Sequence, residues 1–370
     1  MMWLIESLIE KWFSSKLSIH KIEKSLKGLE QDERGKEIKQ KFSLTNLQVS
    51  CVERKIKLVK NIEEYVNMLQ NFVRQASEEK NILIVFPENN YFDLLGVIPG
   101  FRWLNYYLNQ KMRKHKGNNN YNSRKEHPER INPLFIHILK GMAKPVEEGI
   151  KMIFSSLARA YRLYIYTGTY IVKEGAKIFN AGFFYGPQGE LIGIQKKIHL
   201  TDLEEKLGFQ RGEEMEIYTL PFGKVVCPIC MDATYFETFR IAREKGADLA
   251  LLPIANLEEY NPWKALRGIW PRTQESLIYG LKSSLNGWIA GMHFTGKAGI
   301  FAPWMITSHQ DGIINISSHY EGDFLVSGEI DILQLYKIRK ETEYLEDTNI
   351  EFEKDYLEKT YGNADQERAK

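Results

Sequence analysis

Cysteine is scarce in this chain of 370 residues, which contains only Cys51, Cys227 and Cys230. A disulfide-stabilised secreted protein would carry more cysteines, and in pairs, so three are typical of a protein with reduced thiols. Long apolar runs are lacking too. No stretch approaches the ~18 uninterrupted apolar residues of a spanning helix, and Glu6 and Glu10 interrupt the N-terminal run too early for a signal peptide. We therefore expect a cytoplasmic protein.

An excess of charge of either sign is also absent. The chain has 50 basic and 48 acidic residues, which gives a net charge of +2. No segment has the basic and aromatic pattern of a known nucleic-acid-binding motif, so we expect no nucleic-acid partner. Hydrophobic residues make up 43% of the chain, enough for the core of two domains or of one large α/β domain.

The first 43 residues predict a helical N-terminal extension. In residues 1–20, apolar side chains recur on one helical face while charged side chains lie elsewhere. Such a helix either lies on a membrane surface or packs against the protein body or a second copy. Both alternatives are open at this point.

Regular α/β patterning begins near Leu44. An alternating strand at 47–58 precedes a helix at 61–76, with Asn61 as its N-cap. Residues 82–86, ILIVF, are apolar on both faces, which predicts a buried strand in a sheet covered by helices. Pro87 ends this strand and places Glu88 at its carboxyl edge, where open α/β sheets carry functional groups.

Residues 89–142 lose the regular pattern, and glycine and proline break it. We interpret them as a long insertion over the site that Glu88 serves, because loops of this length are usually functional. A helix is expected to begin at Pro145. Strands are then expected at 163–172, 178–185 and 191–194.

The segment 224–237, KVVCPICMDATYFE, carries the strongest signal for chemistry. Its apolar start predicts a buried strand, and residues 231–240 predict a turn into a helix, so Cys230 lies at a strand-to-helix corner. Backbone N–H groups at a helix N-terminus favour a thiolate and stabilise an oxyanion that forms beside it. Cys230 is therefore a candidate nucleophile.

Other interpretations of these residues are open. Cys227 and Cys230 form a C-x-x-C at a strand-to-helix turn, which is also the pattern of a thioredoxin-like redox site. A structural zinc site would need a second pair of ligands at suitable spacing, which the sequence lacks. His199 is either a base for Cys230 or a structural residue. A binding scaffold without catalysis is the remaining alternative.

Glu88, Lys197 and Cys230, each at the end of an expected strand, resemble the catalytic set of the nitrilase or carbon–nitrogen hydrolase superfamily. The surrounding motifs resemble that family too: FPE at 86–88, KIHL at 197–200 and ICMDATYFE at 229–237. The resemblance covers residues 44–333 and implies an α-β-β-α sandwich of two sheets covered by helices. The extension precedes this domain, and a charged C-terminal arm at 334–370 follows it.

The resemblance also implies a role for each residue. Cys230 would attack a carbonyl carbon and form a thioester, while Glu88 would take its proton and return it to the leaving amine. Lys197 would stabilise the tetrahedral oxyanion together with the backbone N–H of Met231. The resemblance suggests Glu205 as a second carboxylate that raises the pKa of Glu88 toward neutrality.

Supporting roles are expected for three further residues. His199 would hold the lysine segment, and Asp232 and Glu237 would support the nucleophile turn. No cofactor and no metal are expected. Since subunits of the family pair through helices, we expect a homodimer or higher homo-oligomer. The helix after Cys230 and a helix at 272–285 are the candidate dimer surfaces.

The substrate is less defined than the chemistry. We expect a small-molecule amide that is hydrolysed at a non-peptide carbon–nitrogen bond. Transfer of the acyl group to an amine at a membrane surface is the alternative. Residues 1–20 or 101–142 would then make a peripheral membrane contact.

Overall fold

The structure, a computed structural model, describes residues 2–27, 29, 44–116, 133–265, 267–342 and 348–368. Its strands are β1 (Leu47–Lys55), β2 (Leu83–Val85), β3 (Tyr164–Glu174), β4 (Lys177–Tyr185), β5 (Leu191–Lys196), β6 (Tyr218–Leu220), β7 (Gly223–Val226), β8 (Leu249–Ile254), β9 (Tyr279–Ile289), β10 (Met292–Phe294), β11 (Gly299–Phe301), β12 (Ile313–Ile316) and β13 (Phe324–Ile330). Its α-helices are α1 (Met2–Lys16), α2 (Ile19–Leu26), α3 (Ile62–Glu78), α4 (Phe101–Lys116), α5 (Pro133–Tyr161), α6 (Asp202–Lys206), α7 (Phe236–Glu244), α8 (Pro262–Ala265), α9 (Ile269–Ser276), α10 (Ile332–Glu341) and α11 (Ile350–Arg368). Short 3₁₀ helices are η3 (Phe92–Val97), η4 (Cys230–Thr234) and η5 (Trp304–Ile306).

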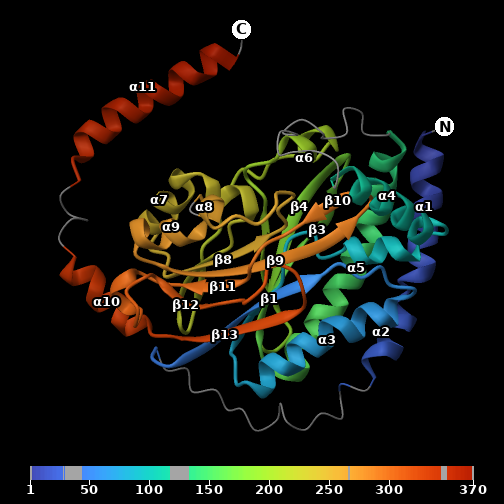
Figure 1. The fold of residues 1–370 in the computed structure, drawn as a ribbon, viewed down its shortest axis with the longest axis horizontal. Helices are drawn as coiled ribbons and strands as arrows, with labels where there is room; N and C mark the ends of the chain where they lie inside the picture. The colour runs from blue at the N-terminus through green and yellow to red at the C-terminus, as the bar shows by residue number, and fades with distance from the viewer. Residues whose placement is uncertain are drawn as a thin grey trace.

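The strands of the described ranges join in one sheet, in which nine lie in the order β5-β4-β3-β2-β1-β9-β8-β7-β6 (Figure 1). In this order, the adjacent strands β3-β2-β1-β9-β8-β7 are parallel to one another. The outer strands β4, β5 and β6 are antiparallel to their neighbours. Parallel neighbours end at the same edge of a sheet. The chain segments that follow β2, β7 and β8 therefore emerge at the same edge of the sheet, where open α/β sheets bind ligands.

Buried side chains form three clusters on this framework. The first packs α3 and α5 against the sheet, and the third packs α7 and α9 against other strands. The second is filled mostly by strand residues, including Val49, Val85 and Leu281. The mixed α/β fold, the buried strand at 82–86 and the helix capped by Asn61 are thus confirmed, since the Asn61 side chain accepts a hydrogen bond from the Glu64 N–H.

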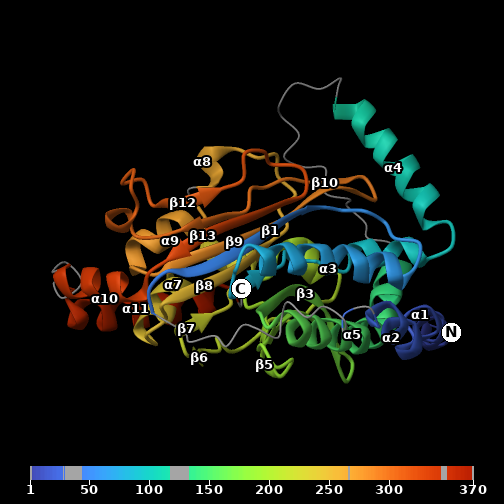
Figure 2. The same cartoon turned by 90° about the horizontal axis from the view of Figure 1, so that it is seen from below.

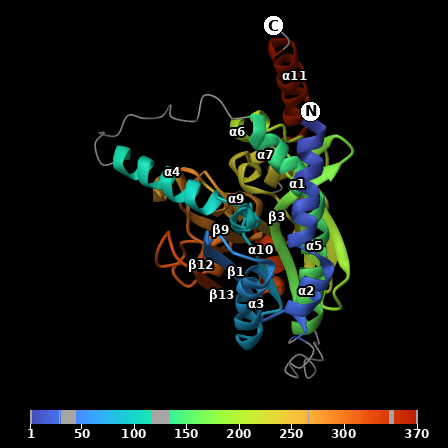
Figure 3. The same ribbon diagram turned by 90° about the vertical axis from the view of Figure 1, so that its right-hand side faces the viewer.

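The N-terminal helix α1 packs along α5 (Figure 3). The approach is close at Gly141, where a Cβ would meet the Glu6 carbonyl oxygen and the side chain of Ile9 at 2.8 Å. A side-chain contact of 2.8 Å between Glu6 and His137 links the same two helices. Packing on the protein body is therefore the alternative that the structure supports for the described part of residues 1–20. None of the helices in the described ranges has the length and apolar character needed to cross a bilayer.

Two predictions about helices were wrong. The region 89–142 contains η3, α4 and the first part of α5, and Pro145 lies inside α5 instead of at its start. The segment 272–285 is not one helix: Leu277 adopts a left-handed conformation with φ of 47°, which ends α9, and β9 begins at Tyr279. Tyr279 and Ser283 are fully buried in the sheet, so they are not available for the dimer contact expected of this segment.

Candidate active site

Glu88, Lys197 and Cys230 meet at the carboxyl edge of the sheet, as predicted. Glu88 follows β2, Lys197 follows β5 and Cys230 follows β7. The Lys197 Nζ atom lies 2.8 Å from Oε1 of Glu88, and both side chains are almost completely buried. The three residues line one cavity of about 500 Å³. Its walls also include Tyr91, Phe92, Phe101, Met292 and Phe294, which make it largely apolar around a polar floor.

The position of Glu88 depends on a close crossing of two backbones. Gly168 in β3 has φ of 70°, and a Cβ there would lie 1.9 Å from the Pro87 carbonyl oxygen, so any side chain would push the Glu88 turn away. The Asn89 N–H donates to Oγ1 of Thr169 at 3.0 Å. These contacts fix the turn that presents Glu88.

The second carboxylate beside Lys197 is Glu204, and the expectation of Glu205 was wrong. Glu204 accepts hydrogen bonds from Lys197 Nζ at 2.9 and 2.7 Å. Glu205 points to solvent and pairs with Arg211. The reason is a capping box: Thr201 is the N-cap of α6, and the Glu204 side chain turns back to its backbone N–H, which directs it inward.

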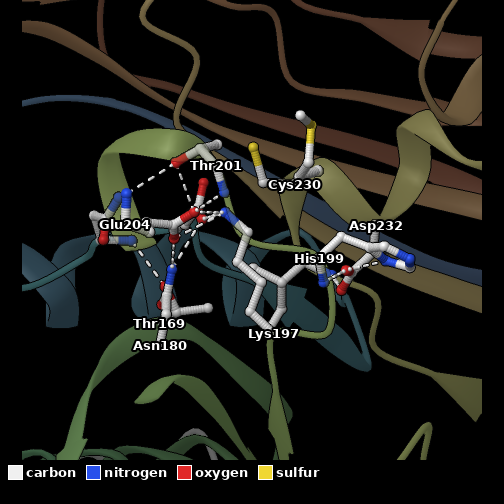
Figure 4. A network of polar contacts seen from close by, with 12 residues as sticks. Thr169, Asn180, Lys197, His199, Thr201, Glu204, Cys230 and Asp232 are labelled. Carbon is white, nitrogen blue, oxygen red and sulfur yellow. Dashed lines mark hydrogen bonds and ion pairs between the residues drawn. The ribbon is translucent and has the colours of Figure 1, made fainter. Parts of the chain in front are cut away.

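Asn180, on β4, joins the two carboxylates. Its Nδ2 atom donates to Glu88 Oε1 at 3.0 Å and to Glu204 Oε1 at 2.9 Å (Figure 4). A neutral donor shared by two buried carboxylates fixes their spacing without adding charge. The contact of Asn180 with both carboxylates depends on the register of β4 against β5.

The surroundings separate the two carboxylates in acidity. Burial raises the pKa of Glu88, and the negative charge of Glu204 raises it further, against the opposing effect of Lys197. The ion pair and hydrogen bonds with Lys197 outweigh burial at Glu204 and lower its pKa. The two carboxylates raise the pKa of Lys197, which stays a cation. Glu88 is thus suited to exchange a proton, and Glu204 to remain an anion.

Cys230 lies at a sharp turn with φ of 45°, a conformation that non-glycine residues adopt rarely. Asp232 holds this turn: its carboxylate accepts hydrogen bonds from the N–H of Ile229 at 2.8 Å and of His199 at 2.7 Å. The His199 Nδ1 atom lies 3.0 Å from the same carboxylate. Asp232 therefore ties the nucleophile turn to the lysine segment, and His199 has the structural contacts expected of it.

The thiol of Cys230 is kept neutral in the free protein. Burial raises its pKa, the charge of Glu88 raises it as well, and Lys197 opposes both effects. Its Sγ atom lies 3.6 Å from Oδ1 of Asn256, which follows β8 and was not recognised in the sequence. A neutral thiol must lose its proton during attack, so a base must stand beside it.

The two cysteines of the C-x-x-C point to different cores. Cys227 is fully buried among strand residues, whereas Cys230 packs against the cluster beneath α7 and α9. Both are free thiols in the structure. This separation is not the arrangement of a redox pair, in which two sulfur atoms must come within bonding distance.

Other expected supports lie as follows. Met231 lines the cavity next to Cys230. Glu237 lies in the first turn of α7 and accepts a hydrogen bond from the Tyr361 hydroxyl of α11, so its observed contact joins two helices and not the nucleophile turn. Arg272 takes that supporting part, since its guanidinium donates to the carbonyls of Ala233 and Thr234 at 3.3 Å. No group of acidic, cysteine and histidine side chains in the described residues is arranged to hold a metal ion.

A matched pair of variants tests the two neighbouring glutamates. Glu204→Gln is expected to lower kcat by at least about 10²-fold and the free energy of unfolding by about 1–3 kcal/mol, because a buried acceptor of Lys197 is lost. Since the charge of Glu204 raises the pKa of Glu88, the acid limb of the pH–rate profile should move to lower pH. Glu205→Gln should leave kcat, the free energy of unfolding and the pH–rate profile unchanged. Effects as large as those of Glu204→Gln would contradict the assignment of Glu204 as the second carboxylate.

The chain resembles known proteins in both sequence and fold. A family profile described as carbon-nitrogen hydrolase matches residues 48–310. The probable hydrolase YhcX of Bacillus subtilis is 23% identical over 302 residues, which are 80% of this chain and 52% of that protein. The chain thus spans about half the length of YhcX. A nitrilase of Pyrococcus abyssi is 31% identical over 200 residues, which are 54% of this chain and 70% of that protein.

One solved structure with a similar fold is an amidase from Nesterenkonia sp. Its TM-score is 0.59 at 14% identity, over 84% of this chain and 97% of that chain. That variant of the amidase carries the acetamide moiety of fluoroacetamide at its active-site cysteine. At this level of identity, the likeness shows a common fold.

Proposed function

Because the chain belongs to the carbon–nitrogen hydrolase family, we propose that it hydrolyses a non-peptide amide through a thioester on Cys230. Glu88 is the general base and acid, and Lys197 stabilises the oxyanion. The observation that carries this proposal is the buried Glu88–Lys197–Glu204 cluster in the same cavity as a cysteine held at a sharp turn.

The first half of the reaction forms the thioester. The Cys230 sulfur attacks the amide carbon while its proton passes to the Glu88 carboxylate, and the carbonyl oxygen becomes an oxyanion. When the carbon–nitrogen bond breaks, Glu88 gives the proton to the departing amine. A raised pKa suits Glu88 to both transfers, because its carboxyl group must take up and release a proton near neutral pH.

The second half returns the enzyme to its starting state. Glu88 takes a proton from a water molecule, which attacks the thioester carbon. The carbon–sulfur bond then breaks, and Cys230 recovers a proton as the carboxylic acid leaves. One amide and one water give one acid and one amine, so no further reactant is needed.

Lys197 acts through its charge in this scheme. Its ammonium group has three N–H donors, and in the resting structure three hydrogen bonds of 2.7–2.9 Å join it to Glu88 and Glu204. The positive charge beside the developing oxyanion lowers the barrier even without a new hydrogen bond, because the site is shielded from water. The Met231 N–H is the proposed hydrogen-bond donor to that oxygen.

Trapping the modified cysteine tests the chemistry directly. Incubation with fluoroacetamide should add one acetamide group, as the Cys230 sulfur displaces fluoride and forms a thioether. Intact-mass measurement and peptide mapping should place the group on Cys230, and ammonia should be released from at least one member of a panel of primary amides. Absence of both the adduct and the ammonia across amides and nitriles would refute the proposal.

Glu88→Gln is expected to lower turnover and, at the same time, to shift the alkylation of Cys230 to lower pH. Loss of the base should lower kcat by about 10²–10⁴-fold. Because the charge and hydrogen bond of Glu88 raise the pKa of Cys230, their loss should move the midpoint of iodoacetamide labelling to lower pH. Labelling is measured by intact mass over a pH series, with Glu205→Gln as the control that matches wild type. A labelling midpoint that stays in place or moves to higher pH would contradict the effect of the Glu88 charge on the Cys230 thiol.

A further inference from the structure

Helix α4 projects from the body of the protein (Figure 2). One face of the helix is held at the β9–β10 turn, where the side chains of Asn105 and Asn109 accept hydrogen bonds from the N–H groups of Ala290 and Gly291 at 2.6 and 2.7 Å. A Cβ at Gly291 would meet the Met112 side chain at 3.0 Å, so the turn and the helix are in close contact. The orientation of α4 is therefore fixed.

The opposite face of α4 carries exposed aromatic side chains. Trp103 is 71% exposed, Tyr106 65% and Tyr107 53%, and the Trp103 and Tyr107 rings stack with centroids 6.0 Å apart. Trp103 and Tyr107, four residues apart, lie on the side of the helix away from Asn105 and Met112, and Tyr106 lies between the two sides. Large aromatic groups exposed together on a projecting helix indicate a binding surface.

The charge of the helix has one sign. Residues 101–114 contain four cations, Arg102, Lys111, Arg113 and Lys114, and no carboxylate. All four side chains are exposed. The Arg113 guanidinium lies over the Trp288 ring at 5.2 Å, and Lys114 lies on the same side of the helix as Trp103 and Tyr107. The occupant of this surface must therefore be anionic and must accept aromatic groups.

We propose that the outer face of α4, defined by Arg102, Trp103, Tyr106, Tyr107 and Lys114, docks on an anionic membrane surface. Trp and Tyr favour the boundary between water and lipid chains, and cations beside them bind anionic headgroups. A second copy of the chain is a poorer occupant, because two such faces brought together would place cations against cations.

Docking in this way would bring the cavity to the membrane. Phe101 at the start of α4 lines the cavity, as do Ala290 and Met292 of the turn that holds the helix. The same rigid contact thus joins the membrane-facing helix to the wall of the site that contains Cys230. This placement does not depend on which reaction the site performs.

Vesicle co-sedimentation of the full chain tests the surface. The protein should sediment with vesicles of phosphatidylcholine and phosphatidylglycerol, far less with phosphatidylcholine alone, and less as salt is raised. Trp103→Ser/Tyr107→Ser and Arg102→Glu/Lys114→Glu should each lower the partition coefficient by about tenfold or more. Trp103 fluorescence should shift to shorter wavelength on binding and be quenched by brominated lipid.

Matched variants elsewhere serve as controls. Trp263→Ser removes an equally exposed tryptophan in α8, and Lys337→Glu/Lys340→Glu reverses two exposed charges in α10. Both should bind as wild type does. The proposal would be overturned if the wild-type protein did not bind anionic vesicles, or if the α4 variants bound as well as the controls. If the wild-type protein did not bind vesicles and the α4 variants changed the oligomeric state, the proposal would also be overturned. The outer face of α4 would then be assigned to contact with a second copy of the chain.

Discussion

Replacing Cys230 with alanine is expected to abolish turnover, with a fall in kcat of at least about 10⁴-fold. Without the sulfur no thioester forms, and the remaining groups can only orient a substrate and polarise its carbonyl. Folding should be retained, because Cys230 is partly exposed to the cavity and its turn is held by Asp232 and Arg272. Intact mass after quenching should show no acyl group on the variant under conditions that load the wild type.

Cys227→Ala is the control for this result. Cys227 is fully buried in a different cluster, so its loss should cost about 1 kcal/mol of unfolding free energy and leave kcat within a few-fold of wild type. Equal inactivation of both variants would instead favour a function that needs two thiols. Cys230→Ser adds a second measurement, since its hydroxyl keeps the volume but is a much weaker nucleophile at this pH.

Glu88, Lys197 and Cys230 could be named together from the sequence because their motifs resemble those of the carbon–nitrogen hydrolase family. Each also follows an expected strand, and strand ends are where an α/β sheet carries functional groups. Asn180 and Asn256 could not be placed in the same way. Their contacts depend on the register of β4 and β8 against neighbouring strands, which a single sequence leaves undetermined.

The local sequence contains a signal that distinguishes Glu204 from Glu205. Thr201 and Glu204 have the spacing of a capping box, which turns the glutamate back over the first turn of the helix, whereas the next residue points about 100° away. The prediction of Glu205 relied on the resemblance and not on this signal. The same signal is available wherever a threonine or serine N-cap is followed three residues later by a glutamate.

The error at 272–285 has a different cause. Small residues at Ser276, Gly280 and Ser283 have helical spacing, but a small residue in a strand also marks a place where another element approaches closely. Gly280 shows this directly, since a Cβ there would meet Ile269 and Thr273 of α9 at 2.7 Å. Tertiary packing against α9 therefore required the strand, and periodicity alone could not show it.

Replacing Lys197 with methionine should affect both activity and stability. Methionine fills a similar volume without charge, so Glu88 and Glu204 would face each other with only Asn180 between them. We expect kcat to fall by at least about 10³-fold, because the oxyanion loses its cation. The free energy of unfolding should fall by about 3–5 kcal/mol at pH 7, because breaking a buried ion pair leaves an uncompensated charge.

The pH dependence of this loss identifies its cause. Without Lys197, the pKa of at least one of the two carboxylates must rise further above the pKa that it has in the unfolded chain. At pH values between the unfolded-state pKa and the folded-state pKa, the folded variant therefore binds more protons than the unfolded chain. Its stability therefore falls as pH rises through that window, and the deficit against wild type should be smaller at pH 5 than at pH 7. Denaturant unfolding at both pH values measures it.

Lys196→Met is the matched control for the adjacent lysine. The Lys196 side chain is partly exposed and pairs with Glu174, itself exposed, so its loss should cost no more than about 1 kcal/mol and should not depend on pH in the same window. Activity should stay within a few-fold of wild type. If Lys197→Met kept more than a tenth of wild-type kcat, or lost no more stability than Lys196→Met, the buried cluster would not be the source of the chemistry. Lys197 joins β5 to both carboxylates, so these two substitutions distinguish a catalytic charge from an ordinary surface lysine one residue away.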